Sequence, residues 1–254
     1  MTPAVAPTPV RAVLIGAGGR MGQVLLRAAA GCASLAFTAA IVPRDSALLA
    51  ASAPGGALHY RADLAAALAQ ADVAIDFSSA AATAHNLSAC RAAGTPLLIG
   101  TTGFAPELKA DFSAAAREIA LLVAANTSIG VTVLGELVRI AAQALPPEFA
   151  VSITESHHAA KRDAPSGTAL TLATAARKMR AAAGKIDIES IRDGDIVGEH
   201  VVRFFSHGEE LTLAHKASDR GLFAAGALAA ALWLSSRAPG RYSMRDLLAI
   251  KTAT

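Results

Sequence analysis

The run Val10-Arg-Ala-Val-Leu-Ile15, followed at once by Gly16-Ala-Gly-Gly-Arg-Met-Gly22, decides the fold of this chain. A short apolar run that stops at a group of glycines is typical of a buried strand entering a tight turn. The residues up to 30 continue as an amphipathic helix, and residues 36–42 form a second apolar run. Strand, glycine turn, helix and strand predict the first unit of a Rossmann-type doubly wound parallel sheet, an α/β fold.

The glycine turn also predicts an anion site. Gly16 permits the tight turn, Gly18 and Gly19 let the backbone approach a pyrophosphate, and the start of the helix carries partial positive charge. The spacing departs from G-x-G-x-x-G, because Met21 stands at the third glycine position and Gly22 follows one residue later. A purely structural turn is the alternative interpretation, but its place between a strand and a helix favours a dinucleotide site.

The same alternation of strands and helices continues to residue 125. Apolar runs predict strands at residues 73–78, 96–99 and 120–125, and helical patterns occupy residues 81–93 and 106–119. Two of these strands end in the polar pairs Thr101-Thr102 and Asn126-Thr127. Either pair alone is ordinary turn chemistry. Because the carboxyl ends of parallel strands line one crevice, their recurrence there predicts a ligand site.

The end of the second strand bears on cofactor choice. Sites selective for NAD usually place an acidic residue here to bind the ribose hydroxyls, whereas this chain has Val42. Arg44 and Arg20 could meet a 2′-phosphate, while Asp45 keeps NADH an option. We therefore expect NADPH to be used at least as well as NADH.

Residues 157–168 carry the densest set of reactive side chains. The stretch His157-His-Ala-Ala-Lys161-Arg-Asp-Ala-Pro-Ser-Gly-Thr168 combines two imidazoles, an ammonium, a guanidinium and a Ser-Gly-Thr turn. A strand predicted at residues 149–154 precedes it, and a helix predicted to reach residue 183 follows. Backbone N–H groups at the start of a helix attract anions. The stretch indicates an enzyme acting on a small anion, with a solvated histidine loop and an ordinary N-cap as the alternative.

The rest of the second half predicts a separate α+β domain. Its expected elements are a helix at residues 129–144, strands at 186–192, 198–206 and 209–216, and a helix at 226–237. His207-Gly208 joins the last two strands as a hairpin. The mixed sheet is expected to support oligomerisation.

Composition narrows the class of partner. The formal charge is +3, and the Lys and Arg residues are dispersed, which argues against nucleic-acid binding. No apolar run of about 18 residues occurs, which argues against a membrane span. Cys32 and Cys90 are far apart and lack metal-ligand spacing, so we expect no metal site and free thiols in a reducing cytoplasm.

The motifs of both halves closely resemble those of the bacterial dihydrodipicolinate reductase family, also called 4-hydroxy-tetrahydrodipicolinate reductases. The matching stretches are residues 16–22, 75–77, 99–104, 124–126, 155–158, 161–169, 198–200, 215–218 and 244–246. The resemblance implies NAD(P)H-dependent reduction of 4-hydroxy-tetrahydrodipicolinate to tetrahydrodipicolinate, in the diaminopimelate route to lysine. It also implies a homotetramer, with a dinucleotide-binding domain at residues 1–128 and 237–254 and a substrate-binding and oligomerisation domain at residues 129–236.

Carried over position by position, the resemblance makes His157 the acid/base residue and Lys161 a second proton donor. The substrate contacts that it implies are His158, Ser166, Gly167 and Thr168. The cofactor contacts that it implies are Gly16, Ala17, Gly18, Gly19, Arg20, Met21, Gly100, Thr101, Thr102, Ala124, Ala125, Asn126 and Thr127. The family's acidic residue at the end of the second strand is replaced by Val42.

The implied substrate is a cyclic imine with two carboxylates. After hydride transfer from the nicotinamide, the reduced ring must gain a proton. Histidine, with a reference pKa near 6.5, suits that step at neutral pH, and we expect His157 to supply the proton. Lys161 would stabilise the developing negative charge.

Two other functions stay open. One is another two-domain NAD(P)-dependent dehydrogenase of the amino-acid dehydrogenase type, which would not require the loop at residues 161–168. The other is a non-catalytic NADPH-binding sensor, which would keep the glycine turn and discard His157 and Lys161.

Overall fold

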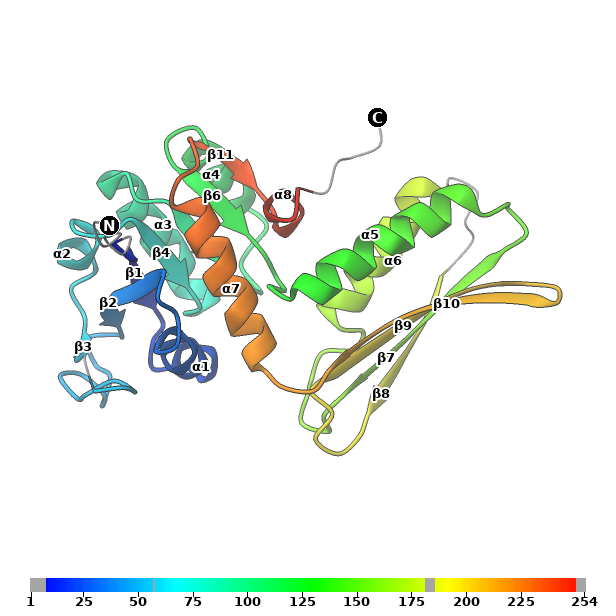
Figure 1. The fold of residues 1–254 in the computed structure, drawn as a ribbon, viewed down its shortest axis with the longest axis horizontal. Coiled ribbons are helices and arrows are strands. Elements are labelled where there is room, and N and C mark those ends of the chain that lie inside the picture. The colour runs from blue at the N-terminus through cyan, green and yellow to red at the C-terminus, as the bar shows by residue number, and fades with distance from the viewer. Residues whose placement is uncertain (1–7, 57, 181–185, 250–254) are drawn as a thin grey trace, which may run out of the picture. The chain divides into compact units, whose positions relative to one another are not determined.

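The computed structural model describes residues 8–56, 58–180 and 186–249. The chain divides into two compact units, one of residues 1–127 with 223–254 and one of Ser128–Leu222. Figure 1 shows the ribbon of both units. Each unit has its own sheet and its own apolar core.

The first unit is built on a seven-stranded sheet in which every pairing is parallel. Its strand order is β11 (Gly240–Tyr242), β6 (Ala120–Val123), β5 (Leu97–Ile99), β4 (Val73–Asp76), β1 (Val10–Ile15), β2 (Leu35–Ile41) and β3 (Tyr60–Arg61). The order reverses between β1 and β4, as in a Rossmann sheet. The expected doubly wound fold is confirmed.

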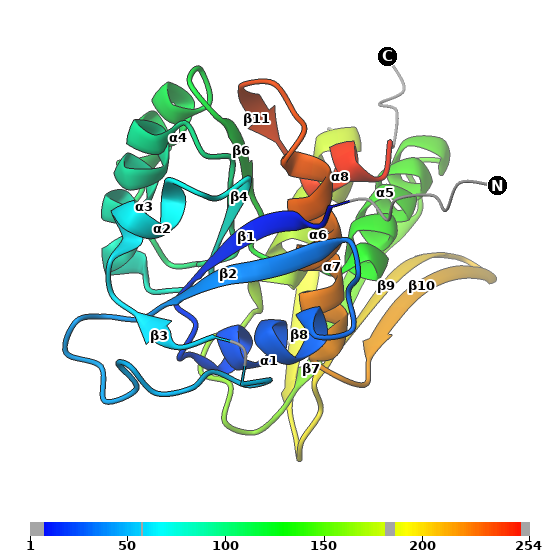
Figure 2. The ribbon, with the colours of Figure 1, turned by 60° about the vertical axis from the view of Figure 1, so that its left-hand side comes forward.

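Successive residues of the central strands face opposite sides of this sheet, and each side has its own apolar core. The helices of the unit are α1 (Arg20–Ala29), α2 (Leu64–Leu68), α3 (Ala80–Ala93), α4 (Leu108–Ala115), α7 (Gly221–Leu234) and α8 (Met244–Leu247). The side that includes Leu14 and Ile75 packs against α1 and α7. The other, which includes Val13 and Ile99, packs against α2, α3 and α4, and Figure 2 shows these two helical layers.

The second unit has a mixed four-stranded sheet in the order β10 (Glu209–Ala217), β9 (Gly198–Ser206), β7 (Ala150–His157) and β8 (Asp187–Arg192). Only the pairing of β7 with β8 is parallel. Helices α5 (Ile129–Ala144) and α6 (Gly167–Met179) pack on one face of this sheet (Figure 1) and share an apolar core with it. The hairpin expected at His207-Gly208 joins β9 to β10, where Gly208 has φ +84°.

Several sequence-based boundaries need correction; the helix expected at residues 226–237, for example, is α7, Gly221–Leu234. The chain returns to the first unit at Phe223 rather than at residue 237, because α7 buries Leu228 and Leu234 in the core of the large sheet. Strand β7 runs to His157 rather than stopping at residue 154, because both neighbouring strands pair with its end.

A further correction concerns α6, which ends at Met179 because Arg180 adopts extended backbone. The remainder of the expected helix to residue 183 lies outside the described residues from residue 181 on, as do residues 250–254 of the expected C-terminal return. The sequence analysis did not predict β3, α2, β11 or α8. No helix within the three described ranges is long and apolar enough to cross a bilayer.

Candidate active site

The glycine turn between β1 and α1 is held by close backbone contacts. Gly16 has φ +80°, and a Cβ atom there would lie 2.5 Å from the carbonyl oxygen of Phe77. A Cβ atom at Gly22 would lie 2.5 Å from the carbonyl oxygen of Gly16 and 2.6 Å from that of Ala17. Gly22 therefore takes the third glycine's part in close packing between helix and turn, although it stands one position late.

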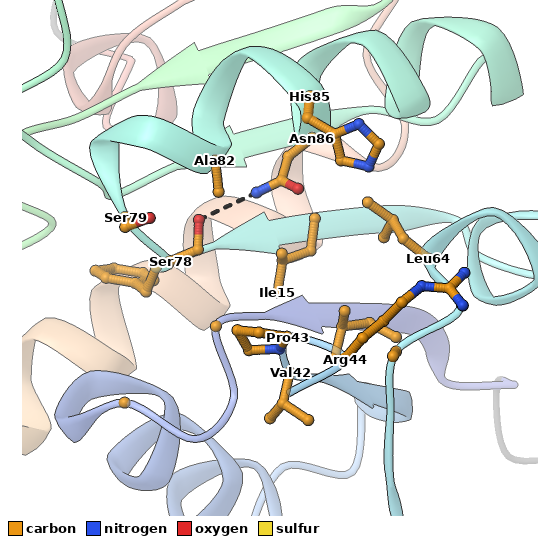
Figure 3. A pocket seen from close by; sticks show the side chains of 15 residues that line it. Ile15, Val42, Pro43, Arg44, Leu64, Ser78, Ser79, Ala82, His85 and Asn86 are labelled. Carbon is orange, nitrogen blue, oxygen red and sulfur yellow. Dashed lines mark hydrogen bonds between the residues drawn. The ribbon is translucent and has the colours of Figure 1, made fainter. Parts of the chain in front are cut away.

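A cavity of about 440 Å³ adjoins this turn. Its lining is Ile15, Gly16, Gly19, Ile41, Val42, Pro43, Arg44, Ala62, Leu64, Phe77, Ser78, Ser79, Ala82, His85 and Asn86. Arg44 extends from the end of β2 toward Leu64 (Figure 3), whereas Arg20 is not part of the lining. The cradle at Gly16, which a Cβ atom would fill, and this cavity fit the phosphates and ribose of a dinucleotide.

Asp76, at the carboxyl end of β4, organises the next segment of the same sheet edge. Its buried carboxylate accepts hydrogen bonds from Ser78 N at 2.8 Å, Thr101 Oγ1 at 3.2 Å and Asn86 Nδ2 at 3.1 Å. Asn86 Nδ2 also lies 3.0 Å from Ser78 Oγ (Figure 3). The network joins α3 to the turn after β5, where Gly100 packs against the Phe77 ring and Thr102 is exposed.

The turn after β6 lies at this edge too. Ala124 is buried and its N–H donates to Ile99 O at 2.9 Å, while Ala125 is exposed. Thr127 is buried, and its hydroxyl donates to Phe223 O at 2.7 Å. Asn126 is half-buried. The three groups of predicted cofactor residues therefore follow β1, β5 and β6 at one sheet edge, but of them only Gly16 and Gly19 line the cavity.

In the second unit, His157 is held by a carboxylate on its own strand. Its Nδ1 lies 2.5 Å from Oε2 of Glu155, two residues earlier on β7. Residues two apart on a strand share a face, and register places Glu155 opposite His200 of β9 and His157 opposite Arg192 of β8. These four side chains thus gather at one end of the sheet.

Glu155 is fully buried and forms the centre of the group. Arg192 donates to both of its oxygens, at 2.7 and 3.0 Å, and Ser166 N donates to Oε1 at 3.2 Å. Burial alone would raise the pKa of Glu155. The hydrogen bonds from Arg192, Ser190 and His157 outweigh burial and hold that pKa at about 2.

Opposing influences act on the pKa of His157. Burial lowers it, and the Glu155 carboxylate raises it. The positive charges of Lys161 and Arg192 lower it again, so that the pKa lies below its ordinary value. The pKa of His157 is thus set by the balance between burial and positive neighbours on one side and the Glu155 carboxylate on the other.

Helix α6 begins beside this group. Ser166 is its N-cap, and the hydroxyl accepts from Ala169 N at 3.1 Å and lies 3.1 Å from His200 Nε2. Gly167 and Thr168 form the first turn, with Gly167 exposed and Thr168 half-buried. The predicted anion-binding residues are thus brought next to His157 through Glu155, which bonds both His157 and Ser166.

His200 is 3% exposed. Burial, followed by the charge of His157, lowers the pKa of His200 to about 4. The side chain is therefore neutral near pH 7 and supports Ser166 rather than donating protons.

The loop after His157 carries the remaining predicted residues. Lys161 Nζ lies 2.7 and 2.8 Å from the two carboxylate oxygens of Asp163, an exposed side chain. His158 Nε2 lies 3.5 Å from Arg220 Nη2. Arg192 fastens the loop by donating to Asp163 O at 2.6 Å.

Sequence reasoning missed several residues of both sites. In the second unit these are Glu155, Arg192 and His200, and in the first unit Phe77, Ser78 and Asn86. The alternation of Glu155 with His157 along one strand was a usable signal, whereas His200 and Arg192 reach the site only through strand register. Within the described ranges, no three His, Cys, Asp or Glu side chains are placed so that they could together hold a metal ion.

The first unit has a Rossmann-type sheet with a dinucleotide cradle. The second unit has a histidine held by a carboxylate beside the start of a helix, where backbone N–H groups attract anions. Together these features define a two-domain nucleotide-dependent oxidoreductase. Comparison with known proteins narrows this class. The family model described as dihydrodipicolinate reductase, N-terminus, matches residues 10–127, and that described as dihydrodipicolinate reductase, C-terminus, matches residues 130–248.

Curated relatives agree over nearly the full length. The 4-hydroxy-tetrahydrodipicolinate reductase of Anaeromyxobacter dehalogenans is 41% identical, over 95% of this chain and 98% of the relative. That of Nitrosomonas europaea is 38% identical, over 96% and 100%. The solved structure of dipicolinate-bound dihydrodipicolinate reductase from Paenisporosarcina sp. TG-14 shares the fold, with a TM-score of 0.80 at 22% identity over 92% of this chain and 97% of that one. This chain belongs to the dihydrodipicolinate reductase family, whose members are NAD(P)H-dependent oxidoreductases.

Proposed function

We propose that this protein reduces 4-hydroxy-tetrahydrodipicolinate to tetrahydrodipicolinate with NAD(P)H, in the diaminopimelate route to lysine. The observation that carries the proposal is the pairing of His157 with Glu155 next to the start of α6. His157 transfers a proton and the start of α6 binds a carboxylate, and reduction of an anionic cyclic imine requires both.

Each residue of the second unit has a defined part in this proposal. The bound cofactor supplies a hydride to the substrate ring. Ser166, Gly167 and Thr168 hold one substrate carboxylate through backbone N–H and hydroxyl donors, and His158 contacts the substrate. Lys161, now paired with Asp163, exchanges that partner for the substrate's negative charge. His157 delivers the proton that completes the reduction.

The cofactor residues of the first unit follow from its sheet edge. The turn Gly16–Met21 would hold the pyrophosphate, and the residues after β5 and β6 would contact the nicotinamide half. Val42 lines the cavity where an acidic residue would bind ribose hydroxyls, and Arg44 lies beside it. The apolar Val42 and the nearby Arg44 support the use of NADPH at least as well as NADH. Measuring kcat/KM with each nucleotide tests this expectation, and a much higher value with NADH would reject it.

Removing the proton-transfer groups tests the function. In a spectrophotometric assay of NADPH and NADH oxidation with enzymatically generated substrate, His157→Gln and Lys161→Ala are each expected to lower kcat at least about tenfold. His207→Gln and Lys109→Ala, which change exposed residues of the same types, are the matched controls. Normal turnover by both site variants would reject the assigned roles. If the wild-type protein binds nucleotide but does not turn over the substrate, the protein is instead a non-catalytic NADPH-binding sensor.

The same proposal includes a homotetramer assembled through the mixed sheet. Phe205 and Ile191 are 40% and 39% exposed on its strands, which supports a covered face in the assembly. Sedimentation equilibrium should then give four times the chain mass of 25.7 kDa. A cytoplasmic location is supported by the free thiols of Cys32 and Cys90.

A further inference from the structure

We propose that Glu155 is the positioning residue of this site: it keeps a proton on Nδ1 of His157, so that Nε2 is the atom at which His157 gives up and regains its catalytic proton. The inference deepens the proposed function and rests on it for its consequence in catalysis. Its structural content, the tautomer of His157, can be measured without substrate.

The acceptor beside Nδ1 of His157 is an ionised carboxylate. Nδ1 of His157 lies 2.5 Å from Oε2 of Glu155, and the pKa of Glu155 is held at about 2. An ionised carboxylate only accepts hydrogen bonds, so the nitrogen that it contacts must carry the hydrogen. This holds for the neutral and for the protonated ring alike, and Nε2 is the nitrogen that changes.

Glu155 is fixed in place and cannot turn away from His157. Both of its oxygens are bound in the fork of Arg192, and Ser166 N holds Oε1. The side chain is 0% exposed, so no water competes for the carboxylate. Arg192 also donates to Asp163 O, which ties the carboxylate, the loop and the start of α6 into one assembly. Bidentate pairs of this kind fix orientation as well as charge.

The other nitrogen of the His157 ring, Nε2, has a different neighbour. Gly198 of β9 lies beside it, and a Cβ atom there would be 3.2 Å from His157 Nε2. A larger residue would crowd this nitrogen. Gly198 thus leaves free the space beside Nε2 that a Cβ atom would take, whereas Nδ1 is held against Glu155, which suits a ring that exchanges protons through Nε2 only.

The groups that face His157 come from every neighbouring segment. Glu155 is the one acidic group among those acting on its pKa, while Lys161 and Arg192 act in the opposite direction. The His200 ring lies edge-on at 5.2 Å between centroids. Replacing the carboxylate by an amide removes the influence that raises the pKa of His157 and leaves the positive charges in place, so that pKa must fall.

Nitrogen-15 NMR of the full-length protein tests the tautomer directly. The chain has seven histidines, and His157→Gln identifies the resonances of His157. In the wild type, at a pH above the pKa of His157, we expect Nδ1 of that ring to carry the hydrogen and Nε2 to be deprotonated. In Glu155→Gln we expect a lower pKa and a mixture of tautomers. The matched control is Glu189→Gln, an exposed carboxylate of β8 whose loss should leave both readouts unchanged.

The pH dependence of turnover tests the consequence in catalysis. A general acid works below its pKa, so the alkaline limb of the kcat profile should move to lower pH in Glu155→Gln. We expect kcat at neutral pH to fall at least about tenfold, with the dissociation constant for NADPH unchanged. A purely structural role for Glu155 would lower stability without moving this limb.

The outcomes separate the inference from the proposed function. Hydrogen on Nε2 in the neutral wild type, or an unchanged pKa and tautomer of His157 in Glu155→Gln, would overturn the inference. If Glu155→Gln does not fold, the wild-type tautomer decides. A wild type with the expected tautomer but no reductase activity would reject the proposed function and leave the tautomer assignment standing.

Discussion

At the scale of the residue, the second unit carries a row of polar side chains across its sheet, buried at Glu155 and His200 and half-buried at His215 and Ser190. Register aligns His215, His200, Glu155 and Ser190 on successive strands. Burying such groups is costly unless they are hydrogen-bonded. Glu155 meets this condition fully, whereas His200 uses Nε2 for Ser166 and has no described hydrogen-bond partner at Nδ1.

That row predicts a pH-dependent stability. The folded-state pKa of His200, about 4, lies below its ordinary value of 6.5. Between these values the unfolded chain binds more protons, so the stability contributed by neutral His200 is complete above pH 6.5 and is lost toward pH 4. The free energy of unfolding, measured with urea at several pH values between 7 and 4, should show this decline. It should change less with pH in His200→Gln. Equal pH dependence of the unfolding free energy in both proteins would contradict the prediction. Glu155, whose pKa falls from an ordinary 4.5 to about 2 in the folded chain, adds a loss of stability only at the acid end of this range, and it does so in both proteins.

At the scale of the element, both helices of the second unit begin in the same way. Ser128 and Ser166 are N-caps whose hydroxyls accept from the backbone N–H three residues on, at 3.2 and 3.1 Å. Each hydroxyl also meets a histidine from the sheet, at 3.4 Å for His215 and 3.1 Å for His200. The helix starts are therefore positioned by the sheet as well as by the local chain.

In the first unit, helix α1 is sensitive to a single added carbon atom at Gly22. A Cβ atom at Gly22 would meet backbone oxygen of the turn at 2.5 Å, and backbone cannot move aside cheaply. Gly22→Ala should lower the free energy of unfolding by about 1–3 kcal/mol and weaken NADPH binding, measured by urea denaturation and fluorescence titration. Gly31→Ala is the control, since its Cβ atom would have ordinary contact at 3.9 Å. An equal effect of the two changes would contradict this account.

At the scale of the whole molecule, the chain crosses between its units twice, after Thr127 and before Phe223. The hydroxyl of Thr127 donates a hydrogen bond to the carbonyl of Phe223, so the two connecting segments are joined where each one leaves the first unit. Because each unit has its own core, a ligand that binds one of them protects that unit first.

Hydrogen exchange locates the nucleotide on this basis. Saturating NADPH should slow amide exchange in peptides covering residues 16–22 and 77–86, which border the cavity of the first unit. At a hundredfold excess over the dissociation constant, the stabilisation amounts to about 2.7 kcal/mol. Protection confined to residues 128–222 would contradict the assignment of the cofactor site. His157→Gln should show the same protection as the wild type.

Much of the fold could be predicted because it follows from local patterns. The apolar run before Gly16 and the alternation that continues to residue 125 predicted β1, α1, β2, β4, α3, β5, α4 and β6, and the helical pattern at residues 129–144 predicted α5 with its bounds. Short elements such as β3 and β11 escaped, since two or three residues carry no period. The alanine-rich α7 was assigned to the wrong unit, because an apolar composition does not say which sheet a helix covers.

The sequence by itself determined that a glycine turn follows the first strand and that His157 and Lys161 stand before the start of a helix, because neighbours along the chain make those features. Only the tertiary structure decided that Glu155, Arg192 and His200 surround that histidine, and that Gly22 replaces the missing third glycine. Strand register and close backbone packing bring these residues together, and neither leaves a mark in the order of residues along one segment.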